Sequence, residues 1–383
     1  MATTAMVAGW FLQSALSVAA PFMTGDLGLS RTQLGLLFFV LAMAGALTAP
    51  VAGRWADRSV SSTMRRLFGS AALGLIVAAT AVNLAWALLA ALVGGIGLGA
   101  SNPVSNKLVS WGVDPGRRGL ALGIKQSGPF LGVILAGLFL PWAAGWMGWR
   151  WAVASTALLP VLALAAFSAP PGRLLPAEIT TRESPLHGGT PPEVWWLAFT
   201  GFLVAMGSGI CVAFIPLYAE QALGFTPASA GLAASVFGLV GVAGRIGWGA
   251  RAERWRDPTG FLAWSALIGG AAGLMILAGR VAEWLLWAGV AVGGASMLAW
   301  HAVAWLAVLH RVEHGRVGSA SGVIHRANLV GVAVGPPVAG WLTDRSGSYD
   351  PCWLLVTAVL GFAGAVLAWR ARNPAGRRRH PAL

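Results

Sequence analysis

Long apolar runs alternate along this chain with short polar segments that carry most of the arginines. The runs from Phe68 to Val82, Phe261 to Gly279 and Leu354 to Ala368 contain no charged residue. A helix that crosses a bilayer needs about 20 mostly apolar residues, and somewhat fewer where its ends reach the interface. A transmembrane β-barrel would instead alternate over segments of about ten residues. Because the runs are continuous, the pattern predicts membrane-spanning α-helices.

The whole pattern predicts an all-α polytopic membrane protein with about twelve transmembrane helices. The longest non-helical stretch is rich in proline and divides these helices into two groups of six. The expected helices are 5–23, 33–52, 67–83, 86–110, 119–141, 150–168, 194–217, 228–248, 260–279, 284–309, 318–341 and 353–369.

The division at the proline-rich stretch gives the expected domains. Residues 1–168 would form an N-terminal six-helix bundle and 194–369 a C-terminal one. Residues 169–193 would be a cytoplasmic linker, and 370–383 a basic cytoplasmic tail. The first run lacks a basic segment before it, so we expect a retained helix and not a cleaved signal peptide.

Composition and charge agree with a membrane location. The 383 residues are 57% hydrophobic and only 10% charged, whereas soluble domains carry about 25% charged residues. The net charge of +13 could suggest nucleic-acid binding, but the basic residues form short clusters on one side of the predicted helices. This bias follows the positive-inside rule. We therefore expect a multi-pass protein of the inner (plasma) membrane, surrounded by the lipid bilayer, with both termini cytoplasmic and no nucleic-acid partner.

The two halves of the chain repeat a short motif in equivalent loops. Gly53-Arg-Trp-Ala-Asp57-Arg58 in the first half corresponds to Gly249-Ala-Arg-Ala-Glu253-Arg254 in the second. Glycine matches alone would be weak, because 52 residues are glycine. A glycine, an alanine, an acid and an arginine at the same spacing in both halves indicate an internal repeat.

These motifs resemble the major facilitator superfamily over nearly the whole chain. Gly53, Asp57 and Arg58 look like that family's Gly-x-x-x-Asp-Arg signature after helix 2. Further similar motifs are Gly128-Pro129 in helix 5, Gly148-Trp149-Arg150-Trp151 between helices 5 and 6, and Gly335-Pro336-Pro337 in helix 11. One departure is Ala91, where many members carry an arginine in helix 4. The proton-handling role of that arginine is therefore not carried over.

The resemblance implies two pseudo-symmetric six-helix bundles around a central cavity that opens alternately to the two sides. It also implies that the repeated loops form a charge latch that clamps the bundles on the cytoplasmic side. The alternative is that these arginines only set the topology. The latch residues would be Gly53, Asp57, Arg58, Gly249, Glu253 and Arg254.

The placement of charges inside the predicted helices suggests the substrate. All 13 acidic residues fall in loops, the linker or helix ends, whereas Lys125 and Arg326 lie within helices. A charged side chain at that depth costs several kcal/mol unless it is hydrated or paired. With no carboxylate nearby, we expect Lys125 and Arg326 to face each other and clamp a substrate anion. The alternative is that Lys125 extends to the interface and Arg326 caps backbone carbonyls.

Other polar residues within the helices would complete the substrate site. The two histidines could carry a coupling proton, because histidine titrates near neutral pH; packing is their ordinary alternative. Lys107 and Arg245 lie nearer to helix ends, where interface contact and a structural role are expected. The additional substrate-binding candidates are Gln13, Asn102, Gln126, His301, His325 and Asn328.

The leading functional hypothesis is a secondary carrier or symporter for a small organic anion such as a carboxylate, acting as a monomer. A proton-coupled exporter of drugs or metabolites is the first alternative, and a sensor or assembly factor on the same fold is the second. An enzyme is not expected, because the sequence contains no HExxH or GxSxG motif. Cys211 and Cys352 do not suggest a disulfide or metal site, and we expect no cofactor.

Overall fold

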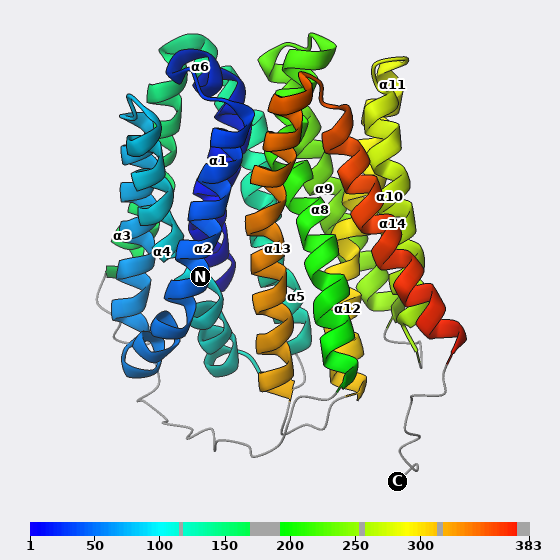
Figure 1. The fold of residues 1–383 in the computed structure, drawn as a ribbon. Helices are drawn as coiled ribbons and strands as arrows, with labels where there is room; N and C mark the ends of the chain where they lie inside the picture. The colour runs from blue at the N-terminus through cyan, green and yellow to red at the C-terminus, as the bar shows by residue number, and fades with distance from the viewer. Residues whose placement is uncertain (115–117, 169–191, 253–256, 312–316, 374–383) are drawn as a thin grey trace.

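The structure is a computed structural model that describes residues 1–114, 118–168, 192–252, 257–311 and 317–373. Every regular element in these ranges is helical, and most helices run side by side along one axis (Figure 1). The elements are α1 (Ala2–Leu27), α2 (Arg31–Arg58), α3 (Val60–Ala79), α4 (Leu84–Gly112), α5 (Arg118–Gln126), α6 (Gly128–Thr156), α7 (Leu158–Ser168), α8 (Pro192–Leu223), α9 (Pro227–Ala252), α10 (Thr259–Ala278), α11 (Glu283–Gly293), the π-helical turn η2 (Gly294–Leu298), α12 (Ala299–Arg311), α13 (Val317–Ser346) and α14 (Asp350–Arg372).

Nine stretches of the described residues are long and apolar enough to cross a membrane. One of them, Gly123–Phe167, has 45 residues and changes direction at Gly148, where φ is 79°. Just after this point Arg150 contacts Asp26, whereas Phe167 packs at the opposite end of the molecule, against a cluster around α3. The stretch therefore makes two crossings. Two further long helices, α3 and α13, lie beside these stretches, so the arrangement agrees with the expected count of about twelve spanning helices. The predicted all-α polytopic fold is confirmed.

The predicted helix 119–141 differs from the structure in one respect. It is divided into α5 and α6, which meet at Ser127. Pro129 lies in the first turn of α6, and proline has no backbone N–H to continue the hydrogen bonds of a preceding helix. The break is important for the site because it leaves a backbone carbonyl of α5 without its helical partner.

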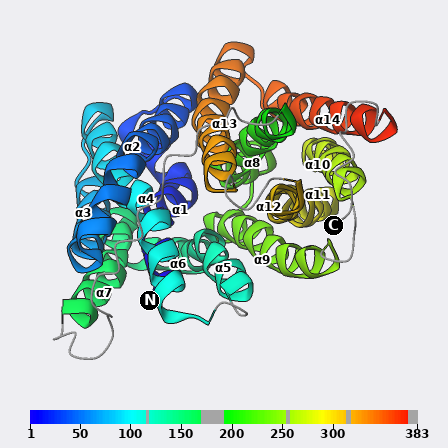
Figure 2. The same cartoon turned by 90° about the horizontal axis from the view of Figure 1, so that it is seen from below.

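The first seven helices gather on one side of the molecule and α8 to α14 on the other (Figures 1 and 2). At the α2–α13 seam, a Cβ added to Gly35 would lie only 2.5 Å from the carbonyl oxygen of Pro336. At the α6–α9 seam, a Cβ on Gly137 would lie 2.3 Å from the carbonyl oxygen of Gly231. Small residues allow helices to approach closely within a membrane. The expected linker 169–193 and tail 370–383 lie mostly outside the described residues, so these domain boundaries stay predictions.

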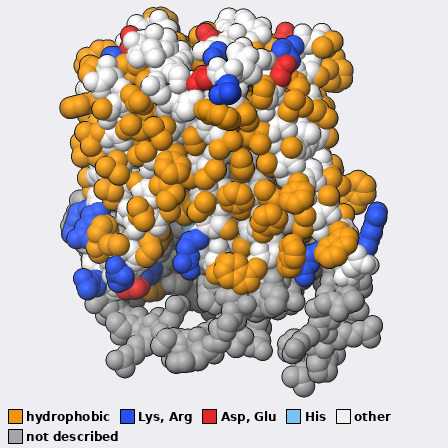
Figure 3. Space-filling view, viewed as in Figure 1, with side chains coloured by type: hydrophobic (Ala, Val, Ile, Leu, Met, Phe, Trp, Pro, Cys, Tyr) orange, Lys and Arg blue, Asp and Glu red, His pale blue; other side chains and the backbone are white. Residues whose placement is uncertain are grey.

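The side chains on the surface distinguish the two ends of the helices. The flank seen in Figure 3 is apolar over its middle, and basic side chains gather along its lower edge. We call the end that carries Arg54, Arg58 and Lys107 the inner end, and the end that carries Asp26 and Asp344 the outer end. The positive-inside rule predicts that the inner end faces the cytoplasm, and this orientation stays a prediction.

Candidate functional site

A cavity of about 140 Å³ lies between the two sides of the molecule. Liquid water takes up about 30 Å³ per molecule, so the cavity suits a small solute. Its walls come from α1, α4, α5 and α6 on one side and from α8, α9, η2, α12 and α13 on the other. Six of the eight predicted substrate residues line it, namely Gln13, Asn102, Gln126, His301, His325 and Asn328.

Arg245 supplies a positive charge to the cavity wall. Its Nη1 donates to the carbonyl oxygen of Gln126 at 2.9 Å, and its guanidinium lies 5.3 Å from the ring centre of Phe130. The carbonyl of Gln126 is open to this contact because the N–H of Phe130 bonds to Ser127 instead, at 3.1 Å. The sequence indicated a structural role at the helix end for Arg245, so its position in the cavity was missed.

His301 is held by the turn that precedes its helix. Its Nδ1 lies 3.0 Å from the carbonyl oxygen of Met297, and Trp300 packs edge-on against the ring, with 5.5 Å between ring centres. A carbonyl oxygen can only accept, so Nδ1 carries the proton in this contact. Met297 belongs to the π-helical turn η2, and such turns are frequent at functional sites.

Lys125 is buried beside the cavity and does not line it. Its side chain is 1% exposed, and its Nζ donates to Asn102 Oδ1 at 3.1 Å and to Ser105 Oγ at 3.0 Å. Because the lysine occupies the oxygen of Asn102, the amide N–H groups of that residue are left to donate. Lys125 thus fixes the orientation of a residue in the cavity wall.

The expected clamp of Lys125 and Arg326 is not formed around this cavity. Arg326 is exposed and is not among the residues that line it. Both basic residues directly neighbour a lining residue, Gln126 and His325 respectively. Successive residues on a helix point about 100° apart, since a turn has about 3.6 residues. The two charges of the expected clamp thus lie one residue away from the cavity wall, whereas Gln126 and His325, which the sequence also predicted as substrate residues, line it.

The charges around the cavity are of one sign. Among the described residues that line it, none is aspartate or glutamate. Arg245 and the two histidines are joined there by the amides of Gln13, Asn102, Gln126 and Asn328. Trp10 also lines the cavity, and its Nε1 is buried without an acceptor in the described part of the protein. The cavity therefore offers donors and positive charge to a ligand.

The first of the two expected latch loops lies at the inner end. Lys107 Nζ contacts Asp57 Oδ1 at 2.9 Å, so the described partner of Asp57 is a lysine of α4 in the same half and not an arginine across the seam. Arg58 is exposed, and a Cβ added to Gly53 or Gly249 would meet open space. Glu253 and Arg254 lie outside the described residues. The latch between the halves stays a prediction.

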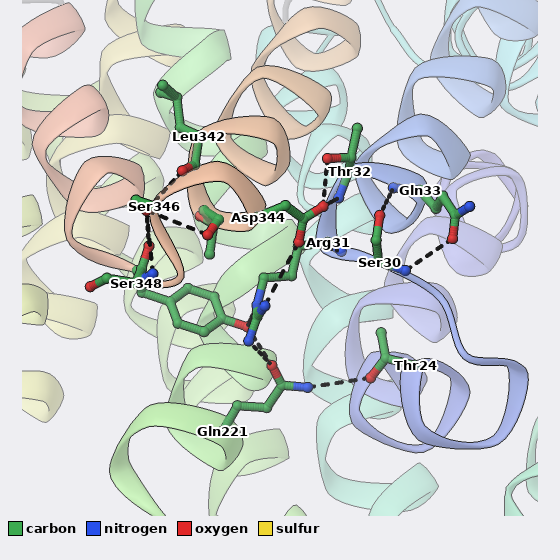
Figure 4. A network of polar contacts seen from close by, with 12 residues as sticks. Thr24, Ser30, Arg31, Thr32, Gln33, Gln221, Leu342, Asp344, Ser346 and Ser348 are labelled. Carbon is green, nitrogen blue, oxygen red and sulfur yellow. Dashed lines mark hydrogen bonds and ion pairs between the residues drawn. The ribbon is translucent and has the colours of Figure 1, made fainter.

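A second polar cluster joins the two halves at the outer end (Figure 4). The carboxylate of Asp344 in α13 accepts hydrogen bonds from the first backbone N–H groups of α2, those of Arg31 at 3.1 Å and Thr32 at 2.8 Å. The Thr32 hydroxyl donates to the same carboxylate at 2.6 Å. A carboxylate at a helix N-terminus is favoured both by these bonds and by the helix dipole. Asp344 therefore caps a helix of the opposite half.

Arg31 and Gln221 extend this cluster. Arg31 Nε donates to the Tyr349 hydroxyl at 3.1 Å, and Tyr349 donates to Gln221 Oε1 at 2.8 Å. Gln221 reaches back to the Thr24 hydroxyl of α1 at 3.5 Å (Figure 4). The cluster holds the outer ends of α1, α2, α8 and α13 together. One signal in the sequence could have indicated the cluster, namely opposite charges near the outer ends of predicted helices 33–52 and 318–341. Nothing in the sequence shows that these charges pair.

Comparison with known proteins decides the family. The profile of the Major Facilitator Superfamily matches residues 2–327 and again residues 197–383. The chain belongs to the Major Facilitator Superfamily. This confirms the resemblance drawn from the loop and proline motifs, and it makes the chain a multi-pass membrane protein of a transporter family.

Several transporters are similar along most of the chain. The hexuronate transporter of Bacillus subtilis (strain 168) is 26% identical over 92% of this chain and 88% of its own. The 3-(3-hydroxy-phenyl)propionate transporter of Escherichia coli (strain K12) is 30% identical over 88% of this chain and 84% of its own. Monocarboxylate transporter 13 of Rattus norvegicus is 27% identical over 66% of this chain and 59% of its own.

A solved structure shares the fold. A bacterial homologue of the human lysosomal transporter Spinster, in an inward-facing and occupied conformation, superposes with a TM-score of 0.79. It is 17% identical, and the match covers 100% of this chain and 98% of that one. At this identity the similarity concerns the fold alone.

Proposed function

We propose that this superfamily member carries a small organic anion of the carboxylate type across the membrane by alternating access. The observation that carries the proposal is the cavity, which combines Arg245, two histidines and four amides with no carboxylate among its described lining residues. A cation within the membrane is costly unless it is paired. Arginine pairs well with carboxylates because its planar guanidinium can form two parallel hydrogen bonds to them.

The relatives support an anionic solute. A hexuronate, a hydroxyphenylpropionate and a monocarboxylate are named as the solutes of three of them. All three are carboxylates, although they differ in size and in the rest of the molecule. The carboxylate is therefore the chemical feature that a shared site would recognise.

The distribution of lining residues favours an anion with one charged end and a compact apolar body. Asn102, Gln126 and Arg245 line the part nearer the inner end, whereas Val133 lies on α6 about 10 Å further toward the outer end, at about 1.5 Å per residue. Val212 and Val332 also line the cavity. We propose that the carboxylate binds near Arg245 and that the apolar body points toward the outer end.

The test is thermal stabilisation of the purified protein by matched ligands. We expect 3-phenylpropionate to stabilise it and the uncharged amide 3-phenylpropionamide not to. A ligand at 100 times its dissociation constant stabilises by about 2.7 kcal/mol, which is easily measured. The effect should vanish in Arg245→Ala, and uptake of the acid into proteoliposomes should fall with it.

The matched control is Arg251→Ala. Arg251 lies on the same helix and is exposed, and its guanidinium carbon lies 5.9 Å from the centre of the Trp248 ring. It does not line the cavity. This variant should respond to the acid as the wild type does. If lipophilic cations or neutral drugs stabilise the wild type and both variants equally, the anion site is wrong and the exporter hypothesis replaces it.

A further inference from the structure

The side of α3 that faces away from the other helices carries two adjacent arginines near the inner end. Arg65 and Arg66 are exposed, and basic side chains gather at the lower left of Figure 3, where Figure 1 shows the inner ends of α2 and α3. The opposite side of α3 packs into the molecule through buried residues that include Met64, Leu67 and Phe68. The two arginines therefore lie on the surface that a membrane surrounds.

An uncharged stripe runs along α3 from these arginines toward the outer end. At about 100° per residue, Gly69, Leu73 and Ile76 all fall within the arc between Arg65 and Arg66. Leu73 and Ile76 are exposed, and a Cβ added to Gly69 would meet open space. We call these three residues the α3 stripe. It ends about 15 Å from Arg66 along the helix axis, which is half of a hydrocarbon core of about 30 Å.

Both guanidinium groups are held in place by contacts that leave their charge unpaired. The Arg66 guanidinium carbon lies 4.3 Å from the centre of the Trp55 ring, and Trp55 packs against the hydrophobic cluster beneath α3. Arg65 Nη1 donates to the Ser61 hydroxyl at 3.2 Å. Among the described residues, no aspartate or glutamate forms an ion pair with either arginine. A guanidinium that stacks through its face keeps N–H groups at its edge for an oxyanion.

The charges around this surface favour an anionic headgroup. Asp57 is the acidic residue nearest to the two arginines in the sequence, and its carboxylate contacts Lys107 Nζ at 2.9 Å. The ammonium of a zwitterionic headgroup would thus find its carboxylate already paired. A phosphate that carries a net negative charge would instead find two cations, and arginine suits phosphate because it can form two parallel hydrogen bonds to it.

We propose that Arg65, Arg66 and the α3 stripe bind one anionic phospholipid of the leaflet around the inner end. The phosphate lies between the two guanidinium groups, and an acyl chain follows the stripe through the gap at Gly69. The positive-inside bias accounts for arginines at this end, but it requires neither their position on both sides of an apolar stripe nor the contact with Trp55. No residue of α2 or α3 lines the cavity, so the lipid site is separate from the proposed solute site.

The test compares two lipids with the same acyl chains on the purified full-length protein in dodecyl maltoside. We expect dioleoyl phosphatidylglycerol to raise the melting temperature and to stay bound as one molecule in native mass spectrometry. Dioleoyl phosphatidylcholine should do neither. Arg65→Gln and Arg66→Gln should each weaken the binding of phosphatidylglycerol about fivefold, the factor that one basic residue near a lipid surface contributes.

A substitution that keeps the charge separates a shaped site from a general attraction. Gly69→Leu would fill the gap between the arginines and Leu73, and the open space there lets the helix accept the side chain. We expect it to weaken phosphatidylglycerol binding as much as the loss of one arginine does. Arg345→Gln is the matched control, because Arg345 is exposed at the outer end with its guanidinium carbon 5.7 Å from the centre of the Trp341 ring. This variant should bind the lipid as the wild type does.

Several results would overturn the proposal. Equal binding of the two lipids, or equal losses in Arg66→Gln and Arg345→Gln, would mean that the arginines select no headgroup. Wild-type binding in Gly69→Leu would mean that no acyl chain lies along the stripe. Glycerol 1-phosphate carries the phosphate without acyl chains, and equal stabilisation by it would identify a site for a soluble phosphate instead. None of these measurements involves a transported solute, so their outcome and that of the proposed function are independent.

Discussion

At the scale of single residues, the expected clamp differs from the cavity by a rotation of one position. The sequence placed the two charges of the clamp at Lys125 and Arg326, but their neighbours Gln126 and His325, which were also among its substrate candidates, line the cavity. Hydropathy fixes the depth of a residue in the membrane. It does not fix which of several polar residues in one helical turn faces the partner helices. Lys125 contacts Asn102 of α4 instead, which gives it an indirect role.

Replacing Lys125 tests this indirect role. In Lys125→Met the Asn102 amide loses the donor that orients it, so we expect anion affinity to fall by about tenfold, or about 1.4 kcal/mol, although the lysine does not line the cavity. Hydrogen bonds to charged groups contribute about 1.5–3 kcal/mol. The measurement is ligand-induced thermal stabilisation. Lys107→Met, at the Asp57 contact, is the control and should bind as the wild type does; equal losses in both would refute a specific role for Lys125.

At the scale of elements, the outer end of the molecule is closed where the last turns of α13 cap the start of α2. The carboxylate of Asp344, near the end of α13, accepts hydrogen bonds from the first backbone N–H groups of α2. These N–H groups have no acceptor within their own helix. The contact joins residues more than 300 positions apart in the chain. It therefore forms only when the two halves meet at their outer ends, and it must break when the outer side opens.

Asp344→Asn should weaken this closure. Neutralising the carboxylate removes its attraction to Arg31 and to the α2 dipole, worth about 1 kcal/mol or more, so the open fraction should rise about fivefold or more. Labelling of Thr24→Cys by a thiol reagent would measure the opening, because Thr24 is buried beside Gln221 of the opposite half and Cys211 and Cys352 are buried. Asp350→Asn is the matched control, since Asp350 pairs with Arg280 inside one half. Unchanged labelling in Asp344→Asn would mean that the cap does not hold the gate.

At the scale of the whole molecule, the proposed alternating access requires the two halves to rock about the cavity. The outer ends meet in the polar cluster and in the backbone contact between α2 and α13. A Cβ added to Gly340 would lie 2.3 Å from the carbonyl oxygen of Arg31, so the closed outer end has no room for a side chain there. The glycine is required by the meeting of the halves and not by its own helix.

Gly340→Ala should therefore separate α2 from α13 and favour the open outer side. Faster labelling of Thr24→Cys and slower anion uptake are the expected results, because the closed outer end becomes harder to form. Gly361→Ala is the control, since a Cβ there would meet open space. If Gly340→Ala labels and transports as the wild type does, the seam tolerates the methyl group and the packing argument fails.

The sequence by itself determined the properties that depend on local composition. Apolar runs of spanning length specify membrane helices, the arginine bias predicts their direction, and the repeated loop motif and helix prolines indicated the superfamily. It also indicated a cavity without acidic residues, because no acid lies within an expected helix. Six of the eight substrate candidates line the cavity, since polar groups inside a membrane tend to face one another or a cavity.

Only the tertiary structure decided the properties that depend on which surfaces meet. Arg245 lies in the cavity wall, where it donates to the Gln126 carbonyl that the α5–α6 break leaves free. Lys125 instead donates to Asn102 of α4. Asp57 pairs with Lys107, and Asp344 caps the start of α2. The carbonyl of Met297 in the π-helical turn determines that Nδ1 of His301 carries the proton. These contacts join residues far apart in the chain or depend on the rotation of a helix about its axis, which packing fixes and hydropathy does not.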